Sequence, residues 1–254
     1  MKIRIIACCR NEEDLLPFFL QYYSSFADKI IIHDCQSTDR SQEIIRSCSK
    51  AELIIHEQKD VDETFLSGIK NESWKSDRDQ YDWNFAVDID EFIYHSNMLE
   101  KLQQYQNLGV TVPHISGYDI YALDFPAFNP ESSIIDHVQY GVSNVALLSK
   151  KCVFNSKLVN INYAHGCHYS APDGVVKYSD DNELMLLHLQ WFGYEKFIKK
   201  YQYYATIMSQ YNIQKNLGMH IIGYANIGRE EFAHVVSDVV AGNNDIRHLL
   251  KKNR

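Results

Sequence analysis

Short β-branched apolar runs alternate with segments of helical period along the first part of the chain. The runs that predict buried strands are Ile3 to Cys8, Ile30 to His33, Leu53 to Ile55 and Trp83 to Val87. Between them apolar residues recur at the spacing of an α-helix, and acidic or cap-type residues stand where those helices would begin. Such alternation is typical of parallel βαβ units, so the sequence predicts an α/β fold.

The second part of the chain is less regular. Four prolines, at positions 113, 126, 130 and 172, interrupt short aromatic runs, which predicts a mixed sheet with long loops. Helical patterns return over residues 194–211 and, more weakly, over 230–240. No repeat or linker divides the chain, so we expect a single domain over residues 1–254, with halves of about 1–108 and 109–254.

Charge and cysteine usage limit the classes of function. Asp and Glu number 33 against 25 Lys and Arg, a net charge of −8, which disfavours a nucleic-acid-binding role. A local basic cluster is interpreted as solvated helix faces and a charged tail, or as peripheral contact with the inner face of the membrane; it comprises Lys196, Lys199, Lys200, Lys251, Lys252 and Arg254. With no apolar leader and no C-x-x-C pair, we expect a cytoplasmic protein.

Polar residues follow the first, second and fourth predicted strands, where an open α/β sheet binds its ligands. Asp88 and Asp90 come directly after the fourth strand, and alternate residues of a strand point to the same side. A divalent cation would relieve the repulsion between these carboxylates and could also bind diphosphate oxygens. The alternative is that the two acids cap the following helix.

Several motifs, taken in order, resemble family 2 glycosyltransferases of the GT-A fold. They are Arg10-Asn11-Glu12-Glu13-x-Leu15, Asp34-x-x-Ser37-Thr38-Asp39, Lys70-Asn71 and Asp88-Ile89-Asp90-Glu91-Phe92. The resemblance is to the bacterial branch of surface-polysaccharide synthesis and is good over roughly the first hundred residues. It implies a GT-A-type, Rossmann-like nucleotide-binding half with a mixed central sheet and C-terminal helices.

The resemblance also implies roles for individual residues. The nucleotide-sugar would contact Cys8, Arg10, Asn11, Glu12, Asp34, Lys70, Asn71 and Asp88. A divalent metal, Mn²⁺ or Mg²⁺, would be bound by Asp88, Asp90 and His188. For His188 the alternative is a core histidine beside an apolar run. His168, in the later and less specific part of the resemblance, would lie on the acceptor side.

The general base is open at this point. The family inverts configuration, and an inverting transferase needs a group that takes the proton of the acceptor hydroxyl. The candidates are Glu91, beside the acid pair, and Asp180 and Asp181 in a polar loop. Each has an alternative, because Glu91 could cap a helix and the two aspartates could belong to an ordinary solvated loop.

The function expected from the resemblance is hexosyl transfer. A sugar would move from a nucleoside diphosphate sugar to a saccharide or lipid-linked acceptor. One alternative is a non-catalytic protein that binds nucleotide-sugars or glycans. Another is an aspartyl-phosphate phosphohydrolase, but that class prefers a hydroxyl residue where this chain has Phe92.

Overall fold

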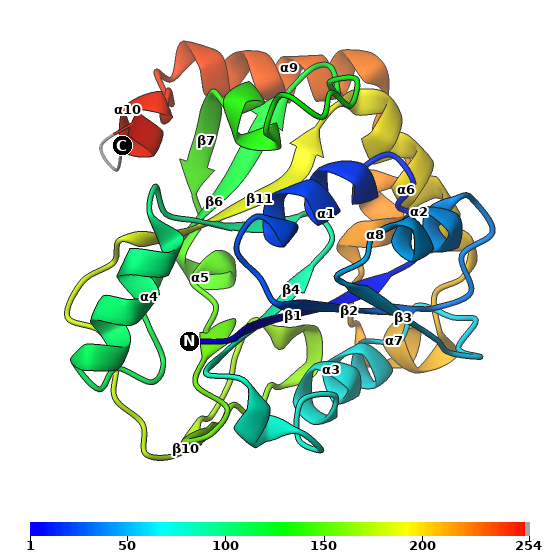
Figure 1. Cartoon of the computed structure of the whole chain (residues 1–254). Helices are drawn as coiled ribbons and strands as arrows, with labels where there is room; N and C mark the ends of the chain where they lie inside the picture. The colour runs from blue at the N-terminus through cyan, green and yellow to red at the C-terminus, as the bar shows by residue number, and fades with distance from the viewer. Residues whose placement is uncertain (252–254) are drawn as a thin grey trace.

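The computed structural model describes residues 1–251, and its strands form two main sheets (Figure 1). The strands are β1 (Ile3–Cys9), β2 (Lys29–Asp34), β3 (Ala51–Ile55), β4 (Trp83–Asp88), β5 (Glu91–Tyr94), β6 (Ile115–Ala122), β7 (Tyr140–Ser143), β8 (Val153–Phe154), β9 (Val159–Asn160), β10 (Asp173–Gly174) and β11 (Leu184–Phe192). The α-helices are α1 (Leu16–Ser24), α2 (Ser41–Ser47), α3 (Glu63–Glu72), α4 (Met98–Asn107), α5 (Val145–Leu148), α6 (Tyr194–Thr206), α7 (Gln210–Lys215), α8 (His220–Tyr224), α9 (Arg229–Ala241) and α10 (Arg247–Lys251). Three 3₁₀ turns are η1 (Arg78–Gln80), η2 (Ile134–His137) and η3 (His165–Cys167).

The first sheet has the order β3-β2-β1-β4-β8. Its first four strands are parallel, and β8 runs antiparallel to β4. In Figure 1, α1 and α2 lie on one side of this sheet and α3 on the other. This parallel pairing, with helices on both faces of the sheet, confirms the predicted βαβ units. Strands covered on both faces are typically apolar runs.

The second sheet is mixed, as predicted, with the order β5-β11-β6-β7. Strand β11 runs antiparallel to β5 and parallel to β6, which pairs with an antiparallel β7. Helix α9 crosses the β6 and β7 end of this sheet (Figure 1). The chain passes from β4 in the first sheet to β5 in the second through Ile89 and Asp90 alone. The acid pair therefore sits where the two sheets meet.

One apolar core joins the two sheets. Ile5 and Phe85 of the first sheet belong to the same buried cluster as Phe92 and Leu186 of the second. Removing this apolar surface from water is the main stabilising contribution to such a fold. The junction of the two sheets, which carries Asp88 and Asp90, therefore lies directly against this packed core.

The C-terminal helices depart from the prediction in one place. The pattern over residues 194–211 predicts one helix, but α6 ends at Thr206 and α7 begins at Gln210. The break arises because Met208 forms a bridge with Val61, and the Ser209 side chain then caps α7 by accepting a bond from the Asn212 amide, 3.0 Å away.

Within residues 1–251, no helix is both long and apolar enough to cross a bilayer. Of the basic tail, Lys252 and Arg254 lie outside the described residues.

Candidate functional site

A cavity of about 660 Å³ opens at the carboxyl ends of β1 and β4. Its walls also include β11, α3, η3 and the segment from α6 to α8, so residues far apart in sequence meet there. This is the position expected for a ligand site in an open α/β sheet. Both predicted acids, Asp88 and Asp90, line it.

Asp88, at the end of β4, is bound by lysines. Its Oδ1 lies 2.7 Å from Nζ of Lys70, and its Oδ2 lies 3.8 Å from Nζ of Lys150. Lys150 also forms a close ion pair with Glu91. Burial raises the pKa of Asp88, but the two ammonium groups outweigh burial and lower it. Asp88 is thus ionised and already charge-balanced.

Asp90 is balanced by a different cation. Its Oδ2 lies 2.9 Å from Nζ of Lys200, and the same Nζ lies 2.6 Å from Oε1 of Glu12. Burial alone would lower the pKa of Lys200, but the carboxylates of Asp90 and Glu12 outweigh it and raise that pKa well above its usual value. Asp90 and Lys200 are therefore a buried pair of full charges.

His188 faces Asp90 from β11. Its Nε2 lies 3.8 Å from Oδ2 of Asp90, while its Nδ1 lies 2.8 Å from Oδ1 of Asp119. Asn144 donates a 2.9 Å bond to the other oxygen of Asp119. Burial lowers the pKa of His188, but the bond to Asp119 and the charge of Asp90 outweigh it and raise that pKa. Histidine ligands of metals commonly have a carboxylate on the second ring nitrogen, as here.

The side chains fit a partial metal site. Asp90 and His188 supply an oxygen and a nitrogen that face each other, and Mg²⁺ or Mn²⁺ usually completes its shell with water and substrate phosphates. Asp88 does not join them, because Lys70 binds it. Among residues 1–251, no group of three or more His, Cys, Asp or Glu is arranged to hold a metal ion. The predicted set of three ligands is therefore not assembled.

Five of the predicted nucleotide contacts line the cavity: Cys8, Arg10, Glu12, Lys70 and Asp88. Arg10 pairs with no carboxylate of residues 1–251. Its Nε and Nη2 donate to the Tyr203 hydroxyl at 3.2 and 3.1 Å, and its guanidinium lies 5.5 Å from the centre of that ring. Arg10 is therefore held against α6 by Tyr203.

The other three predicted contacts lie outside the cavity lining and hold loops in place. Oδ1 of Asn11 accepts a bond from the Thr38 amide at 2.7 Å. Asp34 is fully buried, and its Oδ2 accepts bonds from the Ser37 amide and the Gln42 side chain. Asn71 bonds the backbone of Tyr163 through both its amide nitrogen and its oxygen. These bonds account for Asn11 and Asn71, whereas the Oδ1 of Asp34 is buried and has no hydrogen-bond partner within residues 1–251.

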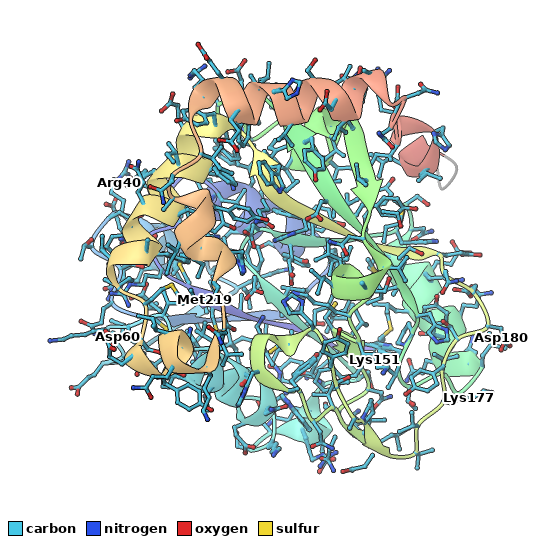
Figure 2. All side chains as sticks on the ribbon, turned by 180° about the vertical axis from the view of Figure 1, so that it is seen from behind. Arg40, Asp60, Lys151, Lys177, Asp180 and Met219 are labelled. Carbon is cyan, nitrogen blue, oxygen red and sulfur yellow. The ribbon has the colours of Figure 1, made fainter. Side chains whose placement is uncertain are left out.

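Of the three candidate bases, only Glu91 lines the cavity. Glu91 is 1% exposed and is held by Lys150 and by the Asp88 amide. Asp181 binds Lys101 at 2.9 Å and accepts a close bond from Tyr105. Neither Asp180 nor Asp181 lines the cavity. Figure 2 places Asp180 at the edge of the molecule opposite Asp60, which does line it.

The prediction that the basic cluster forms solvated helix faces is wrong for Lys196 and Lys200. Lys196 is 8% exposed and donates to the Leu189 carbonyl at 3.0 Å, and Lys200 is the counter-ion of Asp90. The remaining lysine of α6, Lys199, pairs with Glu13 at 3.0 Å. The lysines of α6 are thus engaged with acids or carbonyls of this chain.

Sequence reasoning missed Lys150, Lys200 and Asp119 as site residues. Lys196 and Lys200 are one helical turn apart, which placed them on one face but did not show that the face is buried. Asp119 had no signal, because it lies within a strand of the less regular half. His168 lines the cavity, and its place on the acceptor side stays a prediction.

No protein-family model matches the chain, and no match is found among curated proteins. Among solved structures, TarS 1-349 from S. aureus is 13% identical with a TM-score of 0.45, over 94% of this chain and 71% of that one; TarS has also been solved with UDP. Glucosyl-3-phosphoglycerate synthase from Mycobacterium tuberculosis, solved with Mn²⁺ and UDP, is 17% identical with a TM-score of 0.31, over 46% of this chain and 44% of that one. Similarities this distant assign no function, which has to rest on the cavity itself.

Proposed function

We propose that the protein is a metal-dependent glycosyltransferase of the GT-A fold that inverts configuration at the transferred sugar. The donor is a nucleoside diphosphate sugar, and the acceptor is a saccharide or lipid-linked saccharide in surface-polysaccharide synthesis. The observation that supports this most is the set Asp90, His188 and Asp119 at the seam of two sheets, in a cavity large enough for such a donor.

The acidic and basic residues of the cavity have different roles in this proposal. Asp90 and His188 would hold Mn²⁺ or Mg²⁺, which stabilises the negative charge that develops on the departing diphosphate. Asp119 orients the His188 ring and fixes which nitrogen faces Asp90. Lys70 keeps the Asp88 carboxylate ionised and in place at the nucleotide side. The α6 residues Lys200 and Tyr204 complete the wall of the cavity.

The test begins with donor binding. UDP-glucose, UDP-galactose, UDP-N-acetylglucosamine and GDP-mannose are each added with and without Mn²⁺, and the melting temperature is measured. A donor that binds the folded state raises that temperature by mass action. Release of UDP or GDP from the stabilising donor is then followed over time, together with release of inorganic phosphate.

Metal-dependent release of UDP or GDP supports the transferase. Binding without any release in the presence of Mn²⁺ or Mg²⁺ would instead show a non-catalytic nucleotide-sugar-binding protein. Release of inorganic phosphate from a phosphate monoester such as p-nitrophenyl phosphate would favour a phosphohydrolase.

A further inference from the structure

His168 lines the cavity, and its Nε2 has no hydrogen-bond partner among the residues 1–251 that the structure describes. Its Nδ1 lies 2.9 Å from the Leu147 carbonyl oxygen, and a carbonyl only accepts, so Nδ1 carries the proton. In the neutral ring Nε2 is then unprotonated. Burial, together with the charge of Lys150, lowers the pKa of His168, so the ring is neutral near pH 7.

A glycine lies beside the ring of His168. Gly166 has φ +72°, a conformation that other residues rarely adopt, and a Cβ built on it would lie 3.1 Å from Cδ2 and 3.6 Å from Nε2 of His168. The same Cβ would lie 3.7 Å from Oε2 of Glu63, at the start of α3. Nε2 and this carboxylate therefore border one small space, and Gly166 and both side chains line the cavity.

The groups around His168 suit a base that gains a proton. Lys150 opposes protonation, whereas the carboxylates of Glu91 and Asp88 favour it. His220, on α8, also acts on this region, because the charge of His168 lowers the pKa of His220. The ring thus lies between a cation that keeps it neutral at rest and acids that can stabilise the imidazolium.

We propose that Nε2 of His168 is the general base of the transfer, an inference that rests on the proposed function. The acceptor oxygen forms a bond to the anomeric carbon as the bond from that carbon to the diphosphate oxygen breaks. The electron pair of the broken bond leaves with the diphosphate. The proton of the acceptor hydroxyl moves to Nε2, and the imidazolium later releases it to solvent.

Glu63 is the competing base. Burial, together with the charge of Asp88, raises the pKa of Glu63. Within residues 1–251, however, its carboxylate makes no hydrogen bond or ion pair, so nothing fixes its direction. His168 is preferred because its bond to Leu147 fixes both the tautomer and the ring.

The experiment compares His168→Ala, Glu63→Gln and a matched control, His234→Ala, which removes an exposed histidine of α9. The rate of UDP or GDP release is measured with UDP-glucose, UDP-galactose, UDP-N-acetylglucosamine and GDP-mannose plus Mn²⁺, with water as the acceptor. Loss of a general base typically costs about 100-fold or more, so we expect that fall in kcat for His168→Ala, with the donor KM changed less than about twofold. Added imidazole should restore part of the rate, because it can occupy the space that the side chain leaves.

Three results would overturn the assignment. His168→Ala could keep the wild-type rate, or lose it without rescue by imidazole and with weaker donor binding, which would indicate a structural role. Alternatively, Glu63→Gln could lose the rate while His168→Ala retains it, which would make Glu63 the base. Failure of the proposed function itself looks different, because the wild-type protein would then release no UDP or GDP from any of the four donors.

Discussion

At the scale of single residues, the sequence located the acid pair but not its counter-ions. Repulsion between Asp88 and Asp90 pointed to a metal as the balancing charge. In the structure positive charge is supplied by two lysines. Lys70 stands 18 positions before Asp88, and Lys200 stands 110 positions after Asp90. Lys70 and Asp88 lie within one βαβ unit, whereas the pairing of Lys200 with Asp90 depends on how the C-terminal half folds against the first sheet. No local sequence pattern predicts that packing.

Replacing Asp90 with asparagine should abolish activity and also lower stability. The neutral amide could not balance the charge of Lys200, which is 16% exposed and would keep only Glu12 as its partner. Removing one member of a buried pair can cost about 3–5 kcal/mol, and the remaining carboxylate should reduce this to about 1–3 kcal/mol. Urea unfolding and nucleoside diphosphate release measure the two effects.

The triple variant Glu12→Gln, Asp90→Asn and Lys200→Met separates stability from catalysis, because it removes the ammonium together with both of its carboxylate partners. It should recover most of the lost free energy of unfolding, while activity stays absent. If Asp90→Asn alone kept wild-type turnover, Asp90 could not be a metal ligand.

At the scale of elements, β1, β2 and β4 were predicted well because burial on both faces leaves a continuous apolar run. The start of α6 was also well placed, but the reason for it is a contact that the sequence does not reveal. Gly193 precedes α6 with φ +91°, and a Cβ there would lie 2.5 Å from Cβ of Phe125. The glycine lets β11 turn directly into the helix that carries Lys196 and Lys200 to the site.

Gly193→Ala should therefore destabilise the protein and reduce activity together. Both the positive φ and the clash with Phe125 oppose a side chain, so we expect a loss of about 2 kcal/mol or more in the free energy of unfolding. Gly228→Ala is the matched control, because it also precedes a helix but has open space around its Cβ. Equal effects of the two substitutions on urea unfolding would contradict this account of α6.

Strand β2 carries a pH-sensitive contact at its end. His33 is 4% exposed, its Nδ1 lies 2.8 Å from Nε2 of His56, and its own Nε2 is buried with no hydrogen-bond partner in the described part of the chain, residues 1–251. Burial and the charge of His56 lower the pKa of His33 to about 4. The folded state thus holds His33 neutral at pH values where the unfolded chain, with a pKa near 6.5, binds a proton.

Stability should accordingly fall as pH drops from about 6.5 towards 4, and not above that range. The shift corresponds to a loss of about 2–3 kcal/mol by pH 4.5. His33→Val suits a buried strand position and removes this titration. The difference in unfolding free energy between wild type and variant, measured in urea at pH 7 and pH 4.5, should change by that amount; a constant difference would show that His33 titrates normally.

At the scale of the whole molecule, the site residues of the first half were predictable because its polar loops follow the carboxyl ends of parallel strands, where such sheets bind ligands. Arg10, Asp88 and Asp90 were found in this way, whereas Lys70, in α3, came from the family resemblance. The other wall of the cavity was only partly predictable, since it is built from Asp119 on β6, Lys150 between α5 and β8, and Lys200 on α6, whose meeting is not encoded locally. Asp180 and Asp181 looked suitable by composition, yet they lie away from the cavity.

Because both halves form the cavity, a nucleotide bound there should stabilise the whole fold, and metal should be needed for its full effect. At a concentration of about 100 times its Kd a ligand adds about 2.7 kcal/mol, which for a chain of this size is a rise of roughly 5–10 °C in Tm. We expect UDP or GDP with Mn²⁺ to give this rise, and either component alone to give much less. Asp90→Asn should remove the metal-dependent part. An equal rise with nucleotide in the presence of EDTA would mean that the lysines of the cavity hold the diphosphate without metal, and the metal assignment to Asp90 and His188 would fail.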